Sequence, residues 1–98
     1  MLRYKAKKES VLKTQPLRSG ISIVANIYEA QYAQGKKDFI SKLKIAQKKC
    51  FETDYLLELL FETGYIEEST CKSLQNQCGA IRRILISSLN TVKRAADE

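Results

Sequence analysis

Few residues in this chain of 98 amino acids could perform chemistry. Histidine is absent, which removes the usual nucleophilic triads and histidine-based acid and base catalysis. Glu29 and Asp38 flank a predicted break between two helices, where paired carboxylates could bind a metal ion. A structural role is favoured, because Asp38 near a helix start complements the helix dipole and Glu29 can pair with a nearby lysine. We therefore expect no enzymatic activity, no catalytic residue, no metal site and no cofactor.

Cysteine is the other reactive residue type, and it occurs at Cys50, Cys71 and Cys78. These residues form no CxxC pair, and without histidine the usual zinc-ligand spacings cannot be assembled. Each cysteine falls on a predicted apolar seam of a helix, where a free thiol packs as a small hydrophobic group. Burial is the favoured interpretation, and a redox role is the alternative.

The basic residues point to a binding function, because the net charge of +6 is unevenly distributed. Residues 1–19 and residues 36–49 each contain six basic residues and one acidic residue, whereas residues 50–69 contain six acidic residues and no basic ones. Clustered lysine and arginine attract polyanions by neutralising phosphates and releasing counterions. The residues predicted to contact nucleic acid are Lys36, Lys37, Lys42, Lys44, Arg82, Arg83, Lys93 and Arg94. The alternative is a solvated basic face that only keeps a small protein in solution.

No motif that reads base sequence is visible, whether an aromatic stacking platform, a zinc finger or a KH-type loop. Tyr55 is expected to pack through its ring. Any contact with RNA or DNA should therefore depend on backbone charge and shape.

Helices must position these residues, because one proline and four glycines are too few for a β-rich fold. We expect a single domain over residues 1–98, with a basic helical stub over 1–14 and helices over 16–33, 36–63 and 67–94. Pro16 suits the first turn of a helix, and Gly64 suits the left-handed position after one. No apolar run approaches the roughly 20 residues that span a bilayer, and the basic start lacks a secretory signal. A cytoplasmic location is expected.

Apolar residues at alternating spacings of three and four predict which side of each helix is buried. The stripe of the 16–33 helix contains Leu17, Ile21, Val24 and Tyr28, widened by Ile27. That of the 36–63 helix contains Phe39, Leu43, Ala46, Cys50, Thr53, Leu57 and Leu60. That of the last helix contains Cys71, Leu74, Cys78, Ile81, Leu85, Ser88 and Val92. Asn26 is expected to form a hydrogen bond between helices that sets their register.

Three segments carry a family resemblance: SGISIVANIYEAQ (19–31), KKDFISKLKIA (36–46) and ETDYLLELLFETGYI (52–66). They resemble the bacterial four-helix-bundle proteins encoded by intervening sequences in 23S ribosomal RNA genes. That family is related to the accessory variability determinants of diversity-generating retroelements. The resemblance implies an all-α antiparallel bundle of the four-helix type and a basic homo-oligomer, with a pentamer favoured. It also implies binding of nucleic acid and, in the retroelement branch, of a reverse transcriptase.

The chain departs from this family at its start, because relatives carry a full first helix before the segment that matches residues 11–18. Either the first helix is shortened to a stub, or the chain is a truncation. Three helices without the fourth leave an apolar groove open, and small domains that cannot close a core commonly associate. The predicted function is a non-enzymatic oligomeric bundle that binds RNA or DNA and serves a reverse transcriptase. The alternative is an oligomeric protein scaffold or regulator without nucleic-acid binding.

Overall fold

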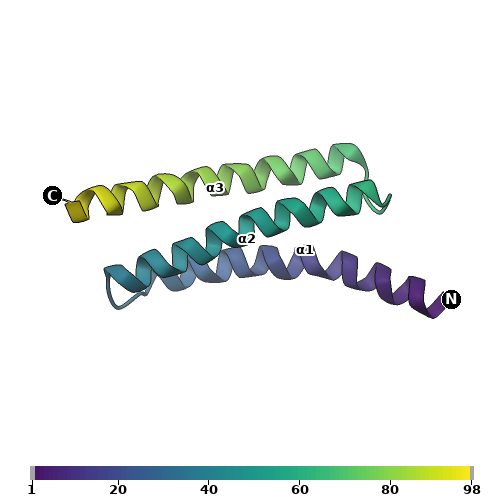
Figure 1. Cartoon of the computed structure of the whole chain (residues 1–98), viewed down its shortest axis with the longest axis horizontal. Helices are drawn as coiled ribbons and strands as arrows, with labels where there is room; N and C mark the ends of the chain where they lie inside the picture. The colour runs from purple at the N-terminus through teal and green to yellow at the C-terminus, as the bar shows by residue number, and fades with distance from the viewer. Residues whose placement is uncertain (1, 98) are drawn as a thin grey trace.

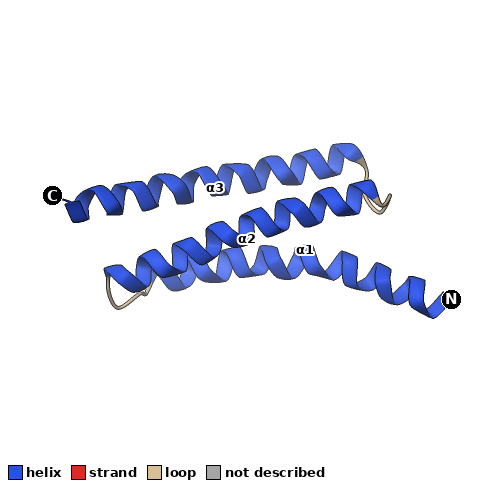
Figure 2. Ribbon diagram, in the orientation of Figure 1, coloured by secondary structure: helices blue, strands red, loops and turns tan. Residues whose placement is uncertain are grey.

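The computed structural model describes the backbone of residues 2–97 and the side chains of residues 14–95. The described residues form three long helices and no strand, namely α1 (Leu2–Gln31), α2 (Lys36–Glu62) and α3 (Glu68–Asp97) (Figures 1 and 2). Helix α2 runs antiparallel to both neighbours and lies between them, and the backbones of α1 and α3 do not approach each other. The result is an elongated layer of 59 × 25 × 15 Å.

The prediction of a four-helix-type bundle with a separate, shortened first helix is wrong, because the stub and the second predicted helix are one continuous helix, α1. Pro16 lies inside this helix, although an interior proline removes a backbone hydrogen bond and costs about 3 kcal/mol. Helices accommodate such a proline by bending, and α1 bends away from α2 in its N-terminal half (Figure 1). The start of α2 at Lys36 is as predicted, and the other helix ends lie one to three residues from those predicted.

The turn between α2 and α3 stops α2 with a pair of backbone hydrogen bonds. The amide of Gly64 donates to the carbonyl of Phe61 at 3.0 Å, and that of Tyr65 donates to Leu60 at 2.9 Å. This is the Schellman arrangement, which needs a left-handed residue just after the helix. Gly64 has φ 83°, so the predicted role of this glycine is confirmed.

The predicted stripe of α2 is confirmed as the centre of the core. Six of its members are buried and the seventh, Phe39, packs against them from a partly buried position. On α3, Cys71, Cys78 and Leu85 are buried, whereas Leu74 is 38% exposed. The buried apolar residues are Ile23, Ala30, Leu43, Ala46, Cys50, Leu57, Leu60, Cys71, Cys78 and Leu85. All three cysteines are therefore buried and unpaired, as predicted.

The predicted inner stripe of α1 is wrong. Its four members are exposed, at 64% for Leu17, 59% for Ile21, 66% for Val24 and 61% for Tyr28. The residues that face α2 instead are Ser19, Ile23 and Ala30, which are buried. Two of these three are small, so they let the two helix backbones approach closely. The larger apolar residues are consequently left on another side of α1.

Asn26 also differs from the prediction, because its amide stays within its own helix. The Nδ2 atom donates to the carbonyl oxygen of Ser22 at 2.8 Å. Ser19 makes hydrogen bonds between α1 and α2 instead: its hydroxyl accepts from the Thr53 hydroxyl at 2.8 Å and donates to the carbonyl oxygen of Lys49 at 3.2 Å. The hydroxyl groups of Ser19 and Thr53 therefore form the hydrogen bond between helices that was predicted for Asn26.

Candidate functional site

A stripe of lysines follows one side of α2. Lys37, Lys44 and Lys48 are exposed and, together with Ile40, Ser41 and Ile45, they line a shallow hollow of about 450 Å³. These positions recur at three- and four-residue steps, so a single side of the helix presents all of them. We call this surface the basic stripe. It offers several ammonium groups beside one another to a ligand that carries repeated negative charge.

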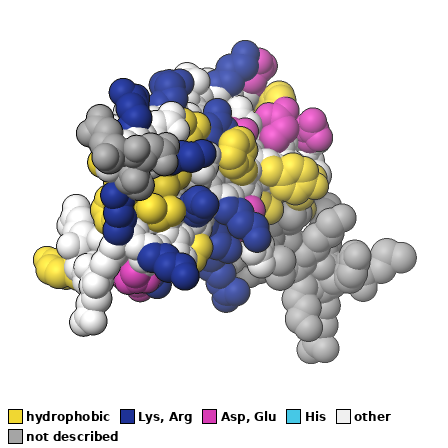
Figure 3. Space-filling model, turned by 60° about the vertical axis from the view of Figure 1, so that its left-hand side comes forward, with side chains coloured by type: hydrophobic (Ala, Val, Ile, Leu, Met, Phe, Trp, Pro, Cys, Tyr) yellow, Lys and Arg dark blue, Asp and Glu magenta, His cyan; other side chains and the backbone are white. Residues whose placement is uncertain are grey.

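The end of the layer where α2 begins adds further positive charge. Contacts between Cys71 and Leu57, and between Gln75 and Asp54, set the antiparallel register of α2 and α3. This register brings the last turns of α3 to the end of the layer where α2 begins, so Lys93 and Arg94 lie at the same end as Lys36 and Lys37. Viewed from this end, lysine and arginine side chains gather over much of the visible surface (Figure 3).

Two of the eight predicted binding residues are engaged within the chain. The Lys42 ammonium lies 2.9 Å from a carboxylate oxygen of Glu29, and this hydrogen bond raises the pKa of Lys42 above its usual value. The predicted pairing of Glu29 with a lysine is thereby confirmed. The guanidinium of Arg82 lies 4.7 Å from the centre of the Phe51 ring, in a cation–π contact. The other six are exposed: Lys36, Lys37, Lys44, Arg83, Lys93 and Arg94.

The structure does not bring all eight residues together. The contact of Arg82 with Phe51 places Arg82 and Arg83 midway along α2, away from the end that carries Lys36 and Arg94. The eight therefore divide into an end group and a middle group, and the basic stripe runs between them.

Charge on α2 opposes the helix dipole. The first turn contains Lys36 and Lys37, where a dipole favours acidic residues, and Asp38 supplies the expected carboxylate there. No basic residue lies in the last turn, which contains Glu62. Such an arrangement costs roughly 0.3 to 1 kcal/mol for each exposed charge, so helix stability does not explain it.

Ammonium groups at this surface can bind anions. In the described part of the chain, no group of three or more histidine, cysteine, aspartate or glutamate side chains could hold a metal ion. Burial raises the pKa of Cys50 to about 11 and also raises the pKa values of Cys71 and Cys78, so the thiols stay protonated. A protonated, buried thiol is a poor nucleophile.

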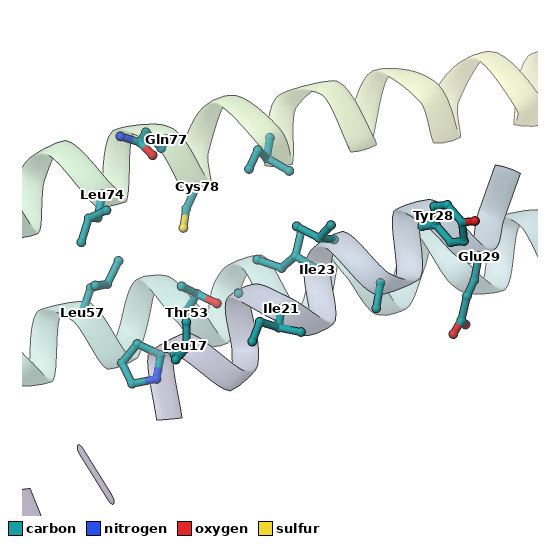
Figure 4. Close-up of a pocket in the computed structure, with 15 residues that line it drawn as sticks. Leu17, Ile21, Ile23, Tyr28, Glu29, Thr53, Leu57, Leu74, Gln77 and Cys78 are labelled. Atoms are coloured by element: carbon teal, nitrogen blue, oxygen red, sulfur yellow. The ribbon is translucent and has the colours of Figure 1, made fainter. Parts of the chain in front are cut away.

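An apolar groove lies on the opposite side of α2. Nine residues make about two and a half helical turns, so Lys44 points away from Thr53, and the same spacing separates Lys48 from Leu57. Thr53 and Leu57 contribute to the groove, which has a volume of about 780 Å³. Its walls are the exposed stripe of α1 and the Leu74, Gln77, Cys78 and Ile81 side of α3 (Figure 4). The layer thus has a basic side and an apolar side.

Comparison with known proteins places this two-sided layer in a family. The sequence model for the 23S rRNA-intervening sequence protein matches residues 2–87. The chain belongs to this family. A crystal structure at 1.70 Å resolution of a protein of unknown function from the S23 ribosomal protein family of Bacteroides thetaiotaomicron VPI-5482 is similar, with a TM-score of 0.80. Its sequence is 49% identical, over 85% of this chain and 77% of that one. No curated protein matches the chain.

In this 23S rRNA-intervening sequence protein, the basic side also contains residues that sequence reasoning missed. Lys48 lines the hollow beside Lys44, one helical turn further on. Phe51 and Tyr55 follow these two lysines at seven-residue spacing, and they are 53% and 67% exposed, so the expectation that Tyr55 packs inside is wrong. The spacing itself was the available signal, since residues seven apart share a side of a helix.

No helix in the described part of this family member is long and apolar enough to cross a membrane.

Proposed function

We propose that this 23S rRNA-intervening sequence protein is a non-enzymatic homo-oligomer that binds the phosphate backbone of nucleic acid through the basic stripe and the basic end of the layer. The observation that carries the proposal is the set of exposed cations, of which Lys37, Lys44 and Lys48 share one hollow of α2. Repeated cations of this kind match repeated phosphates, and their neutralisation releases condensed counterions.

Two exposed aromatic rings favour nucleic acid with unpaired bases. Phe51 and Tyr55 continue the line of the basic stripe, and the Arg82 guanidinium already lies over the Phe51 ring. Proteins that bind single strands combine a positive track along the backbone with aromatic rings on which bases stack. Single-stranded or looped RNA and DNA are therefore the proposed ligands.

The resemblance to the accessory variability determinants supports a reverse transcriptase as a further partner. An enzyme of this kind works on the same single strands, so both partners would meet at one assembly. A protein scaffold that binds no nucleic acid is the second candidate, and the apolar groove specifically favours it, because exposed apolar surface of this size marks protein contacts.

Retention of labelled single-stranded RNA and DNA across a salt series tests the proposal. The variant Lys37→Gln/Lys44→Gln/Lys48→Gln removes the three stripe lysines, and Lys72→Gln is the control, because Lys72 is also exposed but pairs with Glu68 at 2.8 Å. The triple variant should lower the slope of log K against log salt by about 2, at roughly 0.7 for each contact with a single strand. Retention that is equal in the triple variant and the control would contradict the stripe, and no retention at low salt by the unmodified protein would favour the scaffold.

A further inference from the structure

Two rows of residues run along the exposed side of α2, and both rows change chemistry in the same order. Members of a row are seven residues apart, which keeps them on one side of a helix. The first row is Lys44, Phe51 and Glu58, and the second is Lys48, Tyr55 and Glu62. All six side chains are exposed. A ligand that lies along the two rows therefore meets cations first, then aromatic rings and finally carboxylates.

The part of this side that suits a nucleic-acid strand is short. Lys37 and Tyr55 mark its two ends, and about five helical turns, or about 27 Å, separate them. This length suits a segment of about five nucleotides, near the lower limit of known single-strand sites. Arg82 adds a cation beside the rings, with its guanidinium 4.7 Å from the centre of the Phe51 ring. It forms no hydrogen bond or ion pair with the described residues, so its N–H groups can bind a phosphate of the strand.

Beyond the two rings, the surface of α2 and α3 repels phosphate. Residues 50–69 contain six acidic residues and no basic ones. On α3, Lys72 lies beside this half of α2, but its ammonium is 2.8 Å from the Glu68 carboxylate. Glu58 accepts a hydrogen bond from Gln75 at 2.9 Å, which holds its carboxylate at the end of the first row. A strand that continued past the rings would therefore bring its next phosphate among carboxylates that no free cation neutralises.

We propose that the exposed side of α2 binds the end of a single strand, with the last bases stacked on Phe51 and Tyr55 and the rest of the strand running over the basic stripe. The end that lies on the rings carries a hydroxyl and no phosphate, because Glu58 and Glu62 come next along the rows. The other end of the bound segment lies at the basic end of the layer, where a phosphate is attracted. This selection of a strand end rests on the proposed binding of single strands and narrows it to one class of ligand.

Pentanucleotides of adenosine that differ only at their ends test the selection. Strands with a phosphate at the 5′ end, the 3′ end, both ends or neither end compete, unlabelled, against a longer labelled strand in fluorescence anisotropy. The strand with two end phosphates should bind roughly three- to tenfold more weakly than the tighter strand with one, because one of its phosphates must face the carboxylates. A uniformly basic surface predicts the opposite order, since each added phosphate releases more counterions. That opposite order, or equal affinity of all four strands, would overturn the proposal.

Two matched variants locate the selection on the rows. Glu58→Gln/Glu62→Gln removes the carboxylates that follow the rings, so the strand with two end phosphates should then bind at least as tightly as either strand with one. Glu67→Gln/Glu68→Gln removes the same charge at the start of α3 and should leave the order unchanged. All four side chains are exposed, so circular dichroism should show native helix content in both variants. An equal effect of the two variants would contradict a role of the rows.

The same measurements separate the failure of the end selection from the failure of the proposed function. If no strand competes at low salt, nucleic-acid binding is wrong and the end selection is wrong with it. If the strands compete but a second end phosphate does not weaken them, nucleic-acid binding stands and only the end selection is wrong.

Discussion

The hydroxyl oxygens of Ser19 and Thr53 lie 2.8 Å apart in the buried contact between α1 and α2. Both hydroxyls also reach the carbonyl oxygen of Lys49, at 3.2 Å from Ser19 and 2.8 Å from Thr53. Every polar atom in the contact therefore has a partner, as burial requires. The contact holds α1 close to α2 and determines which side of α1 stays outside.

Replacing Ser19 tests this close approach. Ser19→Ala should cost about 0.5 to 1.5 kcal/mol, the net worth of a hydrogen bond, because Thr53 keeps the Lys49 carbonyl as a partner. Ser19→Leu should cost more, since overpacking a contact of small residues commonly costs about 1 to 3 kcal/mol on its own. Urea unfolding followed by circular dichroism measures both, with Gln15→Leu at an exposed site of the same helix as control. A leucine that is tolerated better than alanine would mean that the helices are less closely packed.

The centre of the α2 stripe should be sensitive to truncation. Leu57 is 4% exposed, so Leu57→Ala should lower the free energy of unfolding by about 2 to 5 kcal/mol through lost burial and a residual cavity. Tyr55→Ala, two residues earlier at a site that is 67% exposed, should change it by less than about 0.5 kcal/mol. Equal melting temperatures for the two variants would show that the buried side of α2 is misassigned.

Two glycines should respond in opposite directions to alanine. Gly64 has φ 83°, where an L-residue with a side chain is strained, so Gly64→Ala should destabilise by about 1 to 2 kcal/mol. Gly20 is helical and a Cβ there would meet nothing within 4 Å, so Gly20→Ala should stabilise by about 0.5 to 1 kcal/mol. Thermal unfolding of both variants makes the comparison. The same sign for both would contradict the conformations described for these positions.

Alkaline pH should destabilise the fold through Cys50. Burial raises the pKa of this thiol from 9.0 to about 11, so the unfolded chain ionises first as the pH rises. The stabilisation is fully present below pH 9.0 and is lost as the pH approaches about 11. In Cys50→Ala the free energy of unfolding should no longer fall for this reason between pH 9 and pH 11. Unfolding experiments at a series of pH values measure this difference. A native protein whose Cys50 is alkylated at pH 8 as fast as in urea would contradict the burial.

The exposed aromatic residues should contribute to binding single strands. Tyr55→Ala should weaken the binding of single-stranded RNA by roughly 1 to 3 kcal/mol, which is the usual contribution of stacking on one base. Tyr55→Phe should bind as the unmodified protein does, because it keeps the aromatic ring. Duplex RNA, whose bases are already stacked, should be affected little by either change. Fluorescence anisotropy with labelled strands measures the dissociation constants of both variants. An equal loss for duplex and single strand would point to a general effect on the surface.

The α2 stripe could be predicted from the sequence because that helix has one apolar side, and the pattern from Leu43 to Leu60 leaves no alternative. On α1 the same procedure gave the wrong side. Two apolar patterns compete there, and the larger side chains of Leu17 and Ile21 outweighed Ser19 in the prediction. In the structure the side of α1 with the smaller residues is buried, because close approach to α2 favours small residues. The hydrophobicity of the side chains therefore predicts the wrong buried side for a helix that is covered on one side only.

The candidate site divides in the same way. The positions of Lys36 and Arg94 at one end follow from antiparallel helices, which the spacing of apolar residues already predicts. The pairing of Lys42 with Glu29 was half predictable, since a lysine partner was expected but which lysine depends on the loop geometry between α1 and α2. The contact of Arg82 with Phe51 joins residues far apart in the sequence, and their relation depends on the register of α2 against α3. Register comes from side-chain packing over the whole interface.

The central place of α2 has a consequence for how the chain folds. Among residues 2–97, close backbone contacts between helices join only neighbours in sequence, α1 with α2 and α2 with α3. Such a chain has low contact order, because no segment must wait for a distant one, and folding should be fast. Either helical hairpin can form first and serve as the template for the remaining helix. Opening of α1 alone leaves the other hairpin in place, so amide exchange should be slowest along α2 and each outer helix should open by itself.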